Sequence, residues 1–135
     1  MITGRILKLA AAAMVAAGAA GSAGAMTNAD LAGVWRNPKN TVHVRIAPCG
    51  GTVCGTIVWA DARARAKAGD DLVGTQLMRQ FRQEGAGAWS GRVYVPDYGG
   101  TVSGRLRAAN ANAVVASGCL LGRLLCKSQT WVRVY

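Results

Sequence analysis

Short stretches in which apolar and polar residues alternate recur along most of the chain, and this period of two constrains the fold more than any other feature. In the clearest stretch, residues 41–46, three apolar side chains alternate with His43 and Arg45. Such alternation buries one face of a strand and leaves the other in water. Turn residues separate the stretches at intervals of about ten residues, a spacing typical of an all-β sandwich or barrel.

The pattern predicts eight strands joined by hairpin connections. Eight short antiparallel strands suit a small closed up-and-down barrel, whose interior is filled by side chains or holds one small ligand. The last strand still needs a partner where the chain stops, and pairing it with the first strand leaves no open sheet edge. The expected strands are 33–36, 41–46, 54–59, 73–81, 88–94, 101–107, 113–119 and 127–135.

Three residues expected to face the interior are small, namely Gly104, Ala116 and Gly118. Small inward residues leave room for a ligand. They also ease the curvature of a strand, and glycine inside a strand is typical of a tight bend. The sequence leaves both interpretations open.

The four cysteines predict two disulfides, because an even number is typical of proteins in an oxidising compartment. Three pairings are possible. The pairs Cys49–Cys54 and Cys119–Cys126 are favoured because each flanks a Gly-containing loop that brings its ends together. Loops of this length contribute about 2 to 2.5 kcal/mol each in the chain-entropy model. A four-thiolate zinc site is the alternative, but the spacing is a poor match to zinc ligands, and export disfavours free thiolates.

Residues 1–25 have the pattern of an export signal. Arg5 and Lys8 precede an Ala-rich apolar stretch, and small residues follow at a cleavage site near Ala25. The apolar stretch is too short to span a bilayer stably. Cleavage leaves a single soluble domain, residues 26–135, with fourteen basic and six acidic side chains and hence a net charge of +8. We expect this domain in the periplasm or outside the cell, not spanning a membrane.

The positive charge favours anionic partners such as lipid head groups, cell-wall polymers, lipopolysaccharide or nucleic acid. Nucleic acid is the least expected of them, because no basic run is interleaved with stacking aromatic residues. Residues 61–69 alternate Ala with Arg and Lys. They predict either a helix capped by Asp61 and Gly69 or a mobile basic excursion, and thus either a contact with an anionic surface or a solvated connector.

The sequence contains no recognisable catalytic constellation. His43 is the only histidine and lies opposite the apolar face of its strand. Ser103 and Ser128 lack a nucleophile-elbow sequence, and the neighbours Asp70 and Asp71 point opposite ways on an extended chain. A phosphate-binding glycine loop is also missing from the sequence. We therefore expect a protein that is not an enzyme and that uses neither a cofactor nor a metal.

Five stretches that cover nearly all of the domain carry a resemblance to a known family: 33–35, 49–59, 89–94, 98–104 and 118–133. Together they resemble the exported bacterial family catalogued as domain of unknown function 2147 (DUF2147). The cysteine-bounded C-terminal stretch is the most specific of the five. Family members usually have a Pro- and Asn-containing segment before the fourth strand, whereas this chain has residues 62–68 there.

The resemblance implies a lipocalin-like barrel. Such barrels often carry a Gly-x-Trp on the first strand and a late Arg that stacks over the Trp to seal one end. Gly33, Trp35 and Arg133 occupy comparable positions in this sequence. The role implied for them is structural, and a cation–π contact of this kind contributes about 0.5 to 2 kcal/mol.

The expected function is non-catalytic binding. A barrel of this size offers an apolar cavity with aromatic walls, so we expect the protein to carry or sense a small hydrophobic, lipid-like or acyl-chain ligand. The alternative is a cell-envelope interaction module that binds an anionic polymer or protein through its basic outer surface. The candidate cavity wall consists of Trp59, Met78, Phe81, Trp89 and Tyr94.

Overall fold

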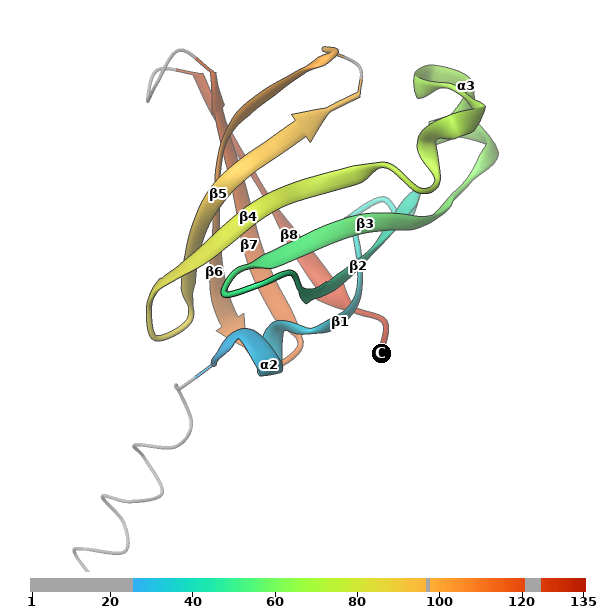
Figure 1. The fold of residues 1–135 in the computed structure, drawn as a ribbon. Helices are drawn as coiled ribbons and strands as arrows, with labels where there is room; N and C mark the ends of the chain where they lie inside the picture. The colour runs from blue at the N-terminus through green and yellow to red at the C-terminus, as the bar shows by residue number, and fades with distance from the viewer. Residues whose placement is uncertain (1–25, 97, 121–124) are drawn as a thin grey trace, which may run out of the picture.

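The structure is a computed structural model that describes residues 26–96, 98–120 and 125–135 (Figure 1). The expected export signal and its cleavage site lie outside these residues. The elements of the described part are α2 (Asn28–Leu31), β1 (Gly33–Arg36), β2 (Val42–Pro48), β3 (Val53–Ala60), α3 (Ala62–Ala68), the 3-10 helix η1 (Asp70–Leu72), β4 (Gln76–Gly85), β5 (Ala88–Val95), β6 (Gly100–Asn110), β7 (Ala113–Leu120) and β8 (Leu125–Arg133).

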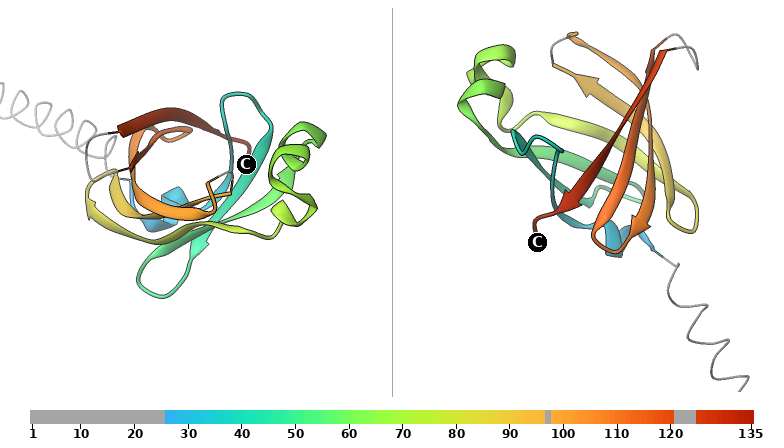
Figure 2. Two further views of the ribbon diagram at one scale, coloured as in Figure 1. Left: turned by 90° about the horizontal axis from the view of Figure 1, so that it is seen from above. Right: turned by 180° about the vertical axis from the view of Figure 1, so that it is seen from behind.

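The strands form one closed antiparallel barrel, in which each strand pairs with the next and β8 returns to β1. Seen from above, the strands surround a single interior (Figure 2). The closing pairs are Trp35 with Arg133 and Arg36 with Val132. The predicted all-β, eight-stranded up-and-down barrel, closed by its first and last strands, is therefore confirmed.

Apolar residues at alternate strand positions fill the interior, as the period of two predicts. Val44 and Ile46 of β2 are only 2% and 3% exposed, while Arg45 between them faces water. The largest fully buried side chains are aromatic and include Trp35 and Trp89. Burial of one such side chain contributes about 1.5 to 3 kcal/mol, so these residues dominate the stability of a small barrel.

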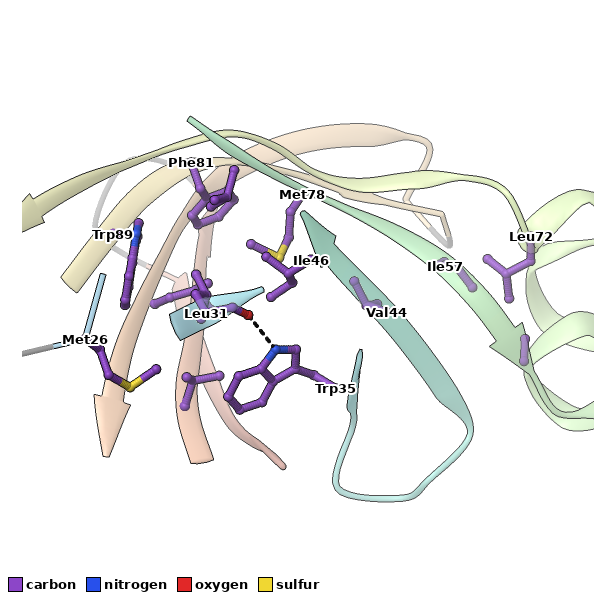
Figure 3. Close-up of a cluster of buried hydrophobic side chains, with 14 residues drawn as sticks. Met26, Leu31, Trp35, Val44, Ile46, Ile57, Leu72, Met78, Phe81 and Trp89 are labelled. Carbon is purple, nitrogen blue, oxygen red and sulfur yellow. Dashed lines mark hydrogen bonds between the residues drawn. The ribbon is translucent and has the colours of Figure 1, made fainter. Parts of the chain in front are cut away.

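The N-terminal segment covers one end of the barrel (Figure 1). Leu31 of α2 is completely buried in the core, and its carbonyl oxygen accepts a hydrogen bond of 2.9 Å from Trp35 Nε1 (Figure 3). Trp89 Nε1 donates to Asn28 Oδ1 at 2.8 Å, and Gln83 Nε2 donates to the Met26 carbonyl at 2.7 Å. The segment is thereby tied to β1, β4 and β5, and it closes this end with the indole nitrogens satisfied.

Both predicted disulfides are confirmed. Cys49 and Cys54 flank the turn between β2 and β3, with their Cα atoms 5.8 Å apart. Cys119 and Cys126 face each other directly across β7 and β8. All four thiols are therefore used in disulfides, which rules out the alternative of a thiolate zinc site.

Two predicted strands are displaced along the chain. The last, predicted at residues 127–135, is β8 at Leu125–Arg133, and the fourth is displaced further. The sequence predicted a strand at residues 73–81, whereas β4 spans Gln76–Gly85. The chain first forms η1, whose Leu72 is buried, and Gly74 then adopts a φ of +97°, a left-handed conformation that glycine tolerates without a steric penalty. This turn delays the start of β4.

A β-bulge explains the mixed periodicity of β4. Gln80 has a φ of +52°, and the pairing with β5 shifts between Arg79 and Arg82. A bulge inserts one extra residue and re-aims the side chains that follow it. Met78 and Phe81 are three positions apart, yet both are buried in the interior.

A second bulge lies between β2 and β3. His43 pairs with Trp59, but the adjacent Val44 pairs with Ile57, so Val58 is the additional residue. Simple alternation from the buried Ile57 would place Trp59 inside the barrel. The bulge instead leaves Trp59 41% exposed, with its ring centroid 4.5 Å from that of His43.

Residues 62–68 form the helix α3, one of the two conformations expected for this segment. Asp61 caps its start, since Asp61 Oδ1 accepts a hydrogen bond of 2.8 Å from Ala64 N. Ala64 and Ala68, one turn apart, pack against the core, while the basic side chains face water. Within the described residues, neither α3 nor any other helix combines the length and the apolar character needed to cross a membrane.

Arg133 joins the two ends of the domain. Its guanidinium carbon lies 4.4 Å from the centre of the Trp35 ring. Nη1 donates to the carbonyl of Ala32 at 2.9 Å, Nη2 to that of Asp30 at 2.5 Å, and Nε to that of Ala111 at 3.1 Å. One side chain therefore links β8 to β1, to the N-terminal segment and to the turn between β6 and β7.

Gly33 is required by this arrangement. A Cβ atom at this position would lie 2.6 Å from Arg133 Nη1 and 2.7 Å from the Tyr135 carbonyl oxygen. Its φ of +143° is also one that other residues rarely adopt. The structure thus brings Gly33, Trp35 and Arg133 together at the closed end of the barrel.

We predict that Arg133→Ala lowers the free energy of unfolding by about 2 to 4 kcal/mol, because a cation–π contact and several charge-assisted hydrogen bonds are lost. Arg133→Lys should lose less, since an ammonium keeps the charge but not the planar fork. Urea denaturation measures both. The matched control is the exposed Arg107→Ala, for which a change below about 0.5 kcal/mol is expected. Equal losses at Arg133 and Arg107 would contradict the proposed role.

We also predict a pH dependence that originates at His43. Desolvation, and then the charge of Arg36, lower the pKa of His43 below its ordinary value of 6.5. The unfolded chain therefore binds this proton more readily than the folded chain does. The contribution of neutral His43 to the free energy of unfolding is fully present above pH 6.5. It is lost as the pH falls from there toward the pKa of His43 in the folded protein.

Urea midpoints between pH 5 and pH 8 test this prediction. The midpoint of the wild type should fall below pH 6.5 by more than that of His43→Gln, because glutamine does not titrate. Parallel curves for the two proteins would contradict it. The lowered pKa of Asp30, caused by its hydrogen bonds with Thr27, acts in the same direction but only near and below pH 3.8, so it does not disturb the comparison.

Candidate functional site

A cavity of about 680 Å³ occupies the interior of the barrel. Small-molecule sites in proteins typically measure about 300 to 1,000 Å³, so this volume is sufficient for a ligand. Residues of β1, β2 and β4 to β8 border the cavity. Its apolar and aromatic lining residues are Trp35, Val44, Ile46, Leu77, Met78, Phe81, Val93, Tyr94, Val95, Pro96, Tyr98, Val102, Leu106, Val114, Ala116, Leu125 and Trp131.

The two ends of the cavity differ. Trp35, tied to α2 through Leu31, borders it at the covered end. At the other end the cavity reaches Pro96 and Tyr98 in the β5–β6 connection and Leu125 at the start of β8. Tyr98 and Leu125 are 63% and 59% exposed. The cavity is therefore closed by the N-terminal segment and accessible from the end opposite α2.

The small inward residues serve two different purposes. A Cβ atom added at Gly118, which borders the cavity, would meet Val102 Cγ2 at an ordinary 3.5 Å, so the backbone there tolerates a side chain. A Cβ atom added at Gly104 would collide with Val93 and would lie 3.0 Å from Phe81 Cζ. Gly104 therefore permits close packing, whereas packing does not require a glycine at position 118 in the cavity wall.

The interior face of β8 carries two polar side chains of the cavity wall. Trp131 packs against the core, and the pairing with β7 continues without a bulge toward the N-terminal end of the strand. Alternation from Trp131 therefore places Gln129, Lys127 and Leu125 on the same face, and all four residues border the cavity. An ammonium group and an amide thus lie on the wall toward the open end.

The five residues expected to form the cavity wall fall into three groups. Met78, Phe81 and Tyr94 border the cavity. Trp89 is buried in the core beside α2, outside the cavity lining. Trp59 lies on the outer face of β3, where the bulge in the β2–β3 pairing turns it toward solvent, and it is not part of the candidate site.

Sequence reasoning missed the polar residues on the interior face of β8, Lys127 and Gln129. All residues from 125 to 130 are exposed, so burial alone does not identify their interior face. The signal that could have found them is alternation counted back from Trp131. Trp35, which we expected only to seal the barrel, also forms part of the cavity wall.

The histidine considered as a catalytic candidate lies outside the cavity. His43 is on the outer face beside Trp59, and its Nε2 lies 2.7 Å from Asn40 Oδ1. Within the described residues, no group of three or more His, Cys, Asp or Glu side chains could hold a metal ion. The buried side-chain nitrogen and oxygen atoms of this part of the chain all have hydrogen-bond partners. The geometry of the cavity is therefore suited to binding an apolar molecule.

Comparisons with known proteins agree with this architecture. Residues 33–133 match the model of a family described as "Uncharacterized protein conserved in bacteria (DUF2147)". No curated protein sequence matches significantly. A solved structure, protein HP1028 from the human pathogen Helicobacter pylori, is described as belonging to the lipocalin family. It superposes with a TM-score of 0.59 at 15% identity, over 78% of this chain and 83% of that chain. The chain therefore belongs to the DUF2147 family, and its barrel is lipocalin-like.

Proposed function

We propose that this protein is an exported, non-catalytic binding protein that carries or senses a small ligand with an apolar or acyl-chain body. The observation that supports this proposal most directly is the cavity of about 680 Å³ inside a closed barrel. Its wall is predominantly apolar, and apolar walls with a few placed polar groups are typical of small-molecule sites. The two disulfides fit an oxidising compartment outside the cytoplasm.

The charges on the cavity wall support an anionic head group on this ligand. Among the described lining residues, Lys127 is a cation on the interior face of β8, and none is a carboxylate. The exposed ammonium group of Lys127 is available to an anion at the open end of the cavity, while the apolar wall beyond it suits the body of the ligand. The ligand that fits best is an amphiphile whose tail extends toward Trp35 and Phe81 and whose head group lies near Lys127.

Native mass spectrometry of protein purified from its own host tests the proposal, and a co-purified lipid-like ligand is expected. Delipidated protein should also take up a dansyl-labelled undecanoic acid in a saturable manner, with blue-shifted emission from the apolar cavity. If the protein carries no ligand and takes up no probe, the carrier function is wrong.

We predict that Gly118→Phe weakens uptake of the dansyl probe by about tenfold or more, because the new ring occupies the cavity. The fold should be retained, since a Cβ atom at Gly118 makes only ordinary contacts. The matched control is Ser128→Phe, which adds the same ring to an exposed position of β8 outside the cavity lining. Equal loss of uptake in both variants would show that the probe binds elsewhere.

We further predict that Lys127→Met weakens binding of a fatty acid by about tenfold, the typical effect of losing a charge-assisted hydrogen bond. Binding of the corresponding methyl ester should not change, because the ester carries no charge. Lys39→Met, at an exposed position between β1 and β2, is the control. Displacement of the dansyl probe measures all these affinities, and an unchanged preference of Lys127→Met for the acid would contradict the assignment.

A further inference from the structure

Five arginines lie on the outer face of three neighbouring strands. Arg79 and Arg82 belong to β4, Arg92 to β5, and Arg105 and Arg107 to β6. Four of them are exposed and Arg79 is partly exposed. Each arginine has a strand neighbour in the core or the cavity wall, and these neighbours are Met78, Phe81, Val93 and Leu106. Strand alternation therefore directs the arginines outward. We call this surface the arginine face.

The pairing register places these cations beside one another. Arg79 of β4 pairs directly with Arg92 of β5. Arg82 of β4 and Arg105 of β6 both pair with Ser90 of β5, one from each side. Two strand spacings separate them, a distance of about 10 Å between their backbones. Like charges directly opposite each other destabilise a sheet, so this arrangement does not serve folding.

Two of the arginines are held in place by neutral groups. Arg79 lies with its guanidinium carbon 5.0 Å from the centre of the Tyr94 ring. Arg92 Nη2 donates to Thr101 Oγ1 at 3.0 Å. Neither contact neutralises the positive charge, so both guanidinium groups stay available to an anion while their positions are restricted.

The other three arginines are unengaged. Within the described residues, no ion pair or side-chain hydrogen bond involves Arg82, Arg105 or Arg107. The nearby carboxylate of Glu84 accepts a hydrogen bond from Ser90 Oγ. The positive charge of the arginine face is therefore largely uncompensated by the part of the chain that the structure describes.

Hydroxyl groups extend this face over β6, β7 and β8. Ser103 pairs with both Arg92 and Cys119, and Ser117 pairs with both Arg105 and Ser128. None of the large exposed apolar side chains of the described residues belongs to β4, β5, β6 or β7. The face consequently lacks the apolar groups that insert into a bilayer and the exposed aromatic rings that stack on nucleic-acid bases.

We propose that the arginine face binds a linear anionic polysaccharide. Arginine recognises sulfate, phosphate and carboxylate groups through two parallel hydrogen bonds, and serine hydroxyls can pair with sugar hydroxyls. Rows of cations across adjacent strands match the repeated charges of such a polymer. The site lies outside the barrel, so this proposal goes beyond ligand carriage and does not depend on it.

A pair of triple variants tests the proposal at constant net charge. The face variant combines Arg82→Ser, Arg92→Ser and Arg107→Ser, and leaves Arg105 intact because it borders the cavity. The control variant combines Arg45→Ser, Arg63→Ser and Arg65→Ser, all exposed positions outside the face. The probe is dextran sulfate, with neutral dextran of equal length as the uncharged comparison, and titration calorimetry is performed over a range of salt concentrations.

The wild type should bind dextran sulfate and not neutral dextran, with an affinity that falls as salt rises. The face variant should bind about tenfold or more weakly and with a shallower salt dependence, whereas the control variant should stay within about threefold of the wild type. Near-UV circular dichroism should match the wild type in both variants, showing that each is folded.

Three results would overturn the proposal. The first is absence of binding by the wild type at about 50 mM salt, where electrostatic contacts are strong. The second is an equal loss in the face and control variants, which would show that net charge alone governs binding. The third is tighter binding to phosphatidylglycerol vesicles or to an oligothymidylate than to dextran sulfate, with the same dependence on the arginine face.

Discussion

The rest of the barrel depends on the contacts that the guanidinium group of Arg133 makes. It stacks on Trp35 of the first strand and donates hydrogen bonds to the carbonyls of Asp30, Ala32 and Ala111. A planar fork with five donors can serve several acceptors while one of its faces covers an aromatic ring. Ring closure, attachment of the N-terminal segment and burial of the Trp35 indole are therefore coupled through one side chain of the last strand.

This coupling divides the interior into a core and a cavity. At the closed end, α2 inserts Leu31 and satisfies the indole nitrogens of Trp35 and Trp89, so no buried polar atom of the described residues lacks a partner there. Beyond Trp35 the interior holds the cavity of about 680 Å³, whose wall includes Gly118. In the proposed carrier function, a ligand enters from the end opposite α2, and Lys127 on β8 contacts the part of it that enters last.

The fold could be predicted from the sequence because strand alternation, turn residues and local cysteine pairs are all short-range signals. Strand closure and both disulfides were predictable for this reason. The bulges at Val58 and Gln80 were not, because a bulge is a property of two paired strands and depends on their register. These two residues decide that Trp59 faces water and that both Met78 and Phe81 face inward. Cavity walls are consequently harder to predict from a sequence than the strands that build them.

Alternation also keeps the two faces of each strand chemically separate. On β6, Leu106 borders the cavity while Arg107 points outward. On β8, Lys127 borders the cavity while Ser128 lies on the outer face. A molecule held inside the barrel and a polyanion held on the arginine face would touch different side chains of the same strands. The backbone between them is a closed hydrogen-bonded ring, which is stiff, so occupation of one site need not disturb the other. Residues 26–135, which carry a net charge of +8, can thus combine an apolar interior with a basic exterior, and only at Arg105 and Tyr94 do the described residues of the two sites overlap.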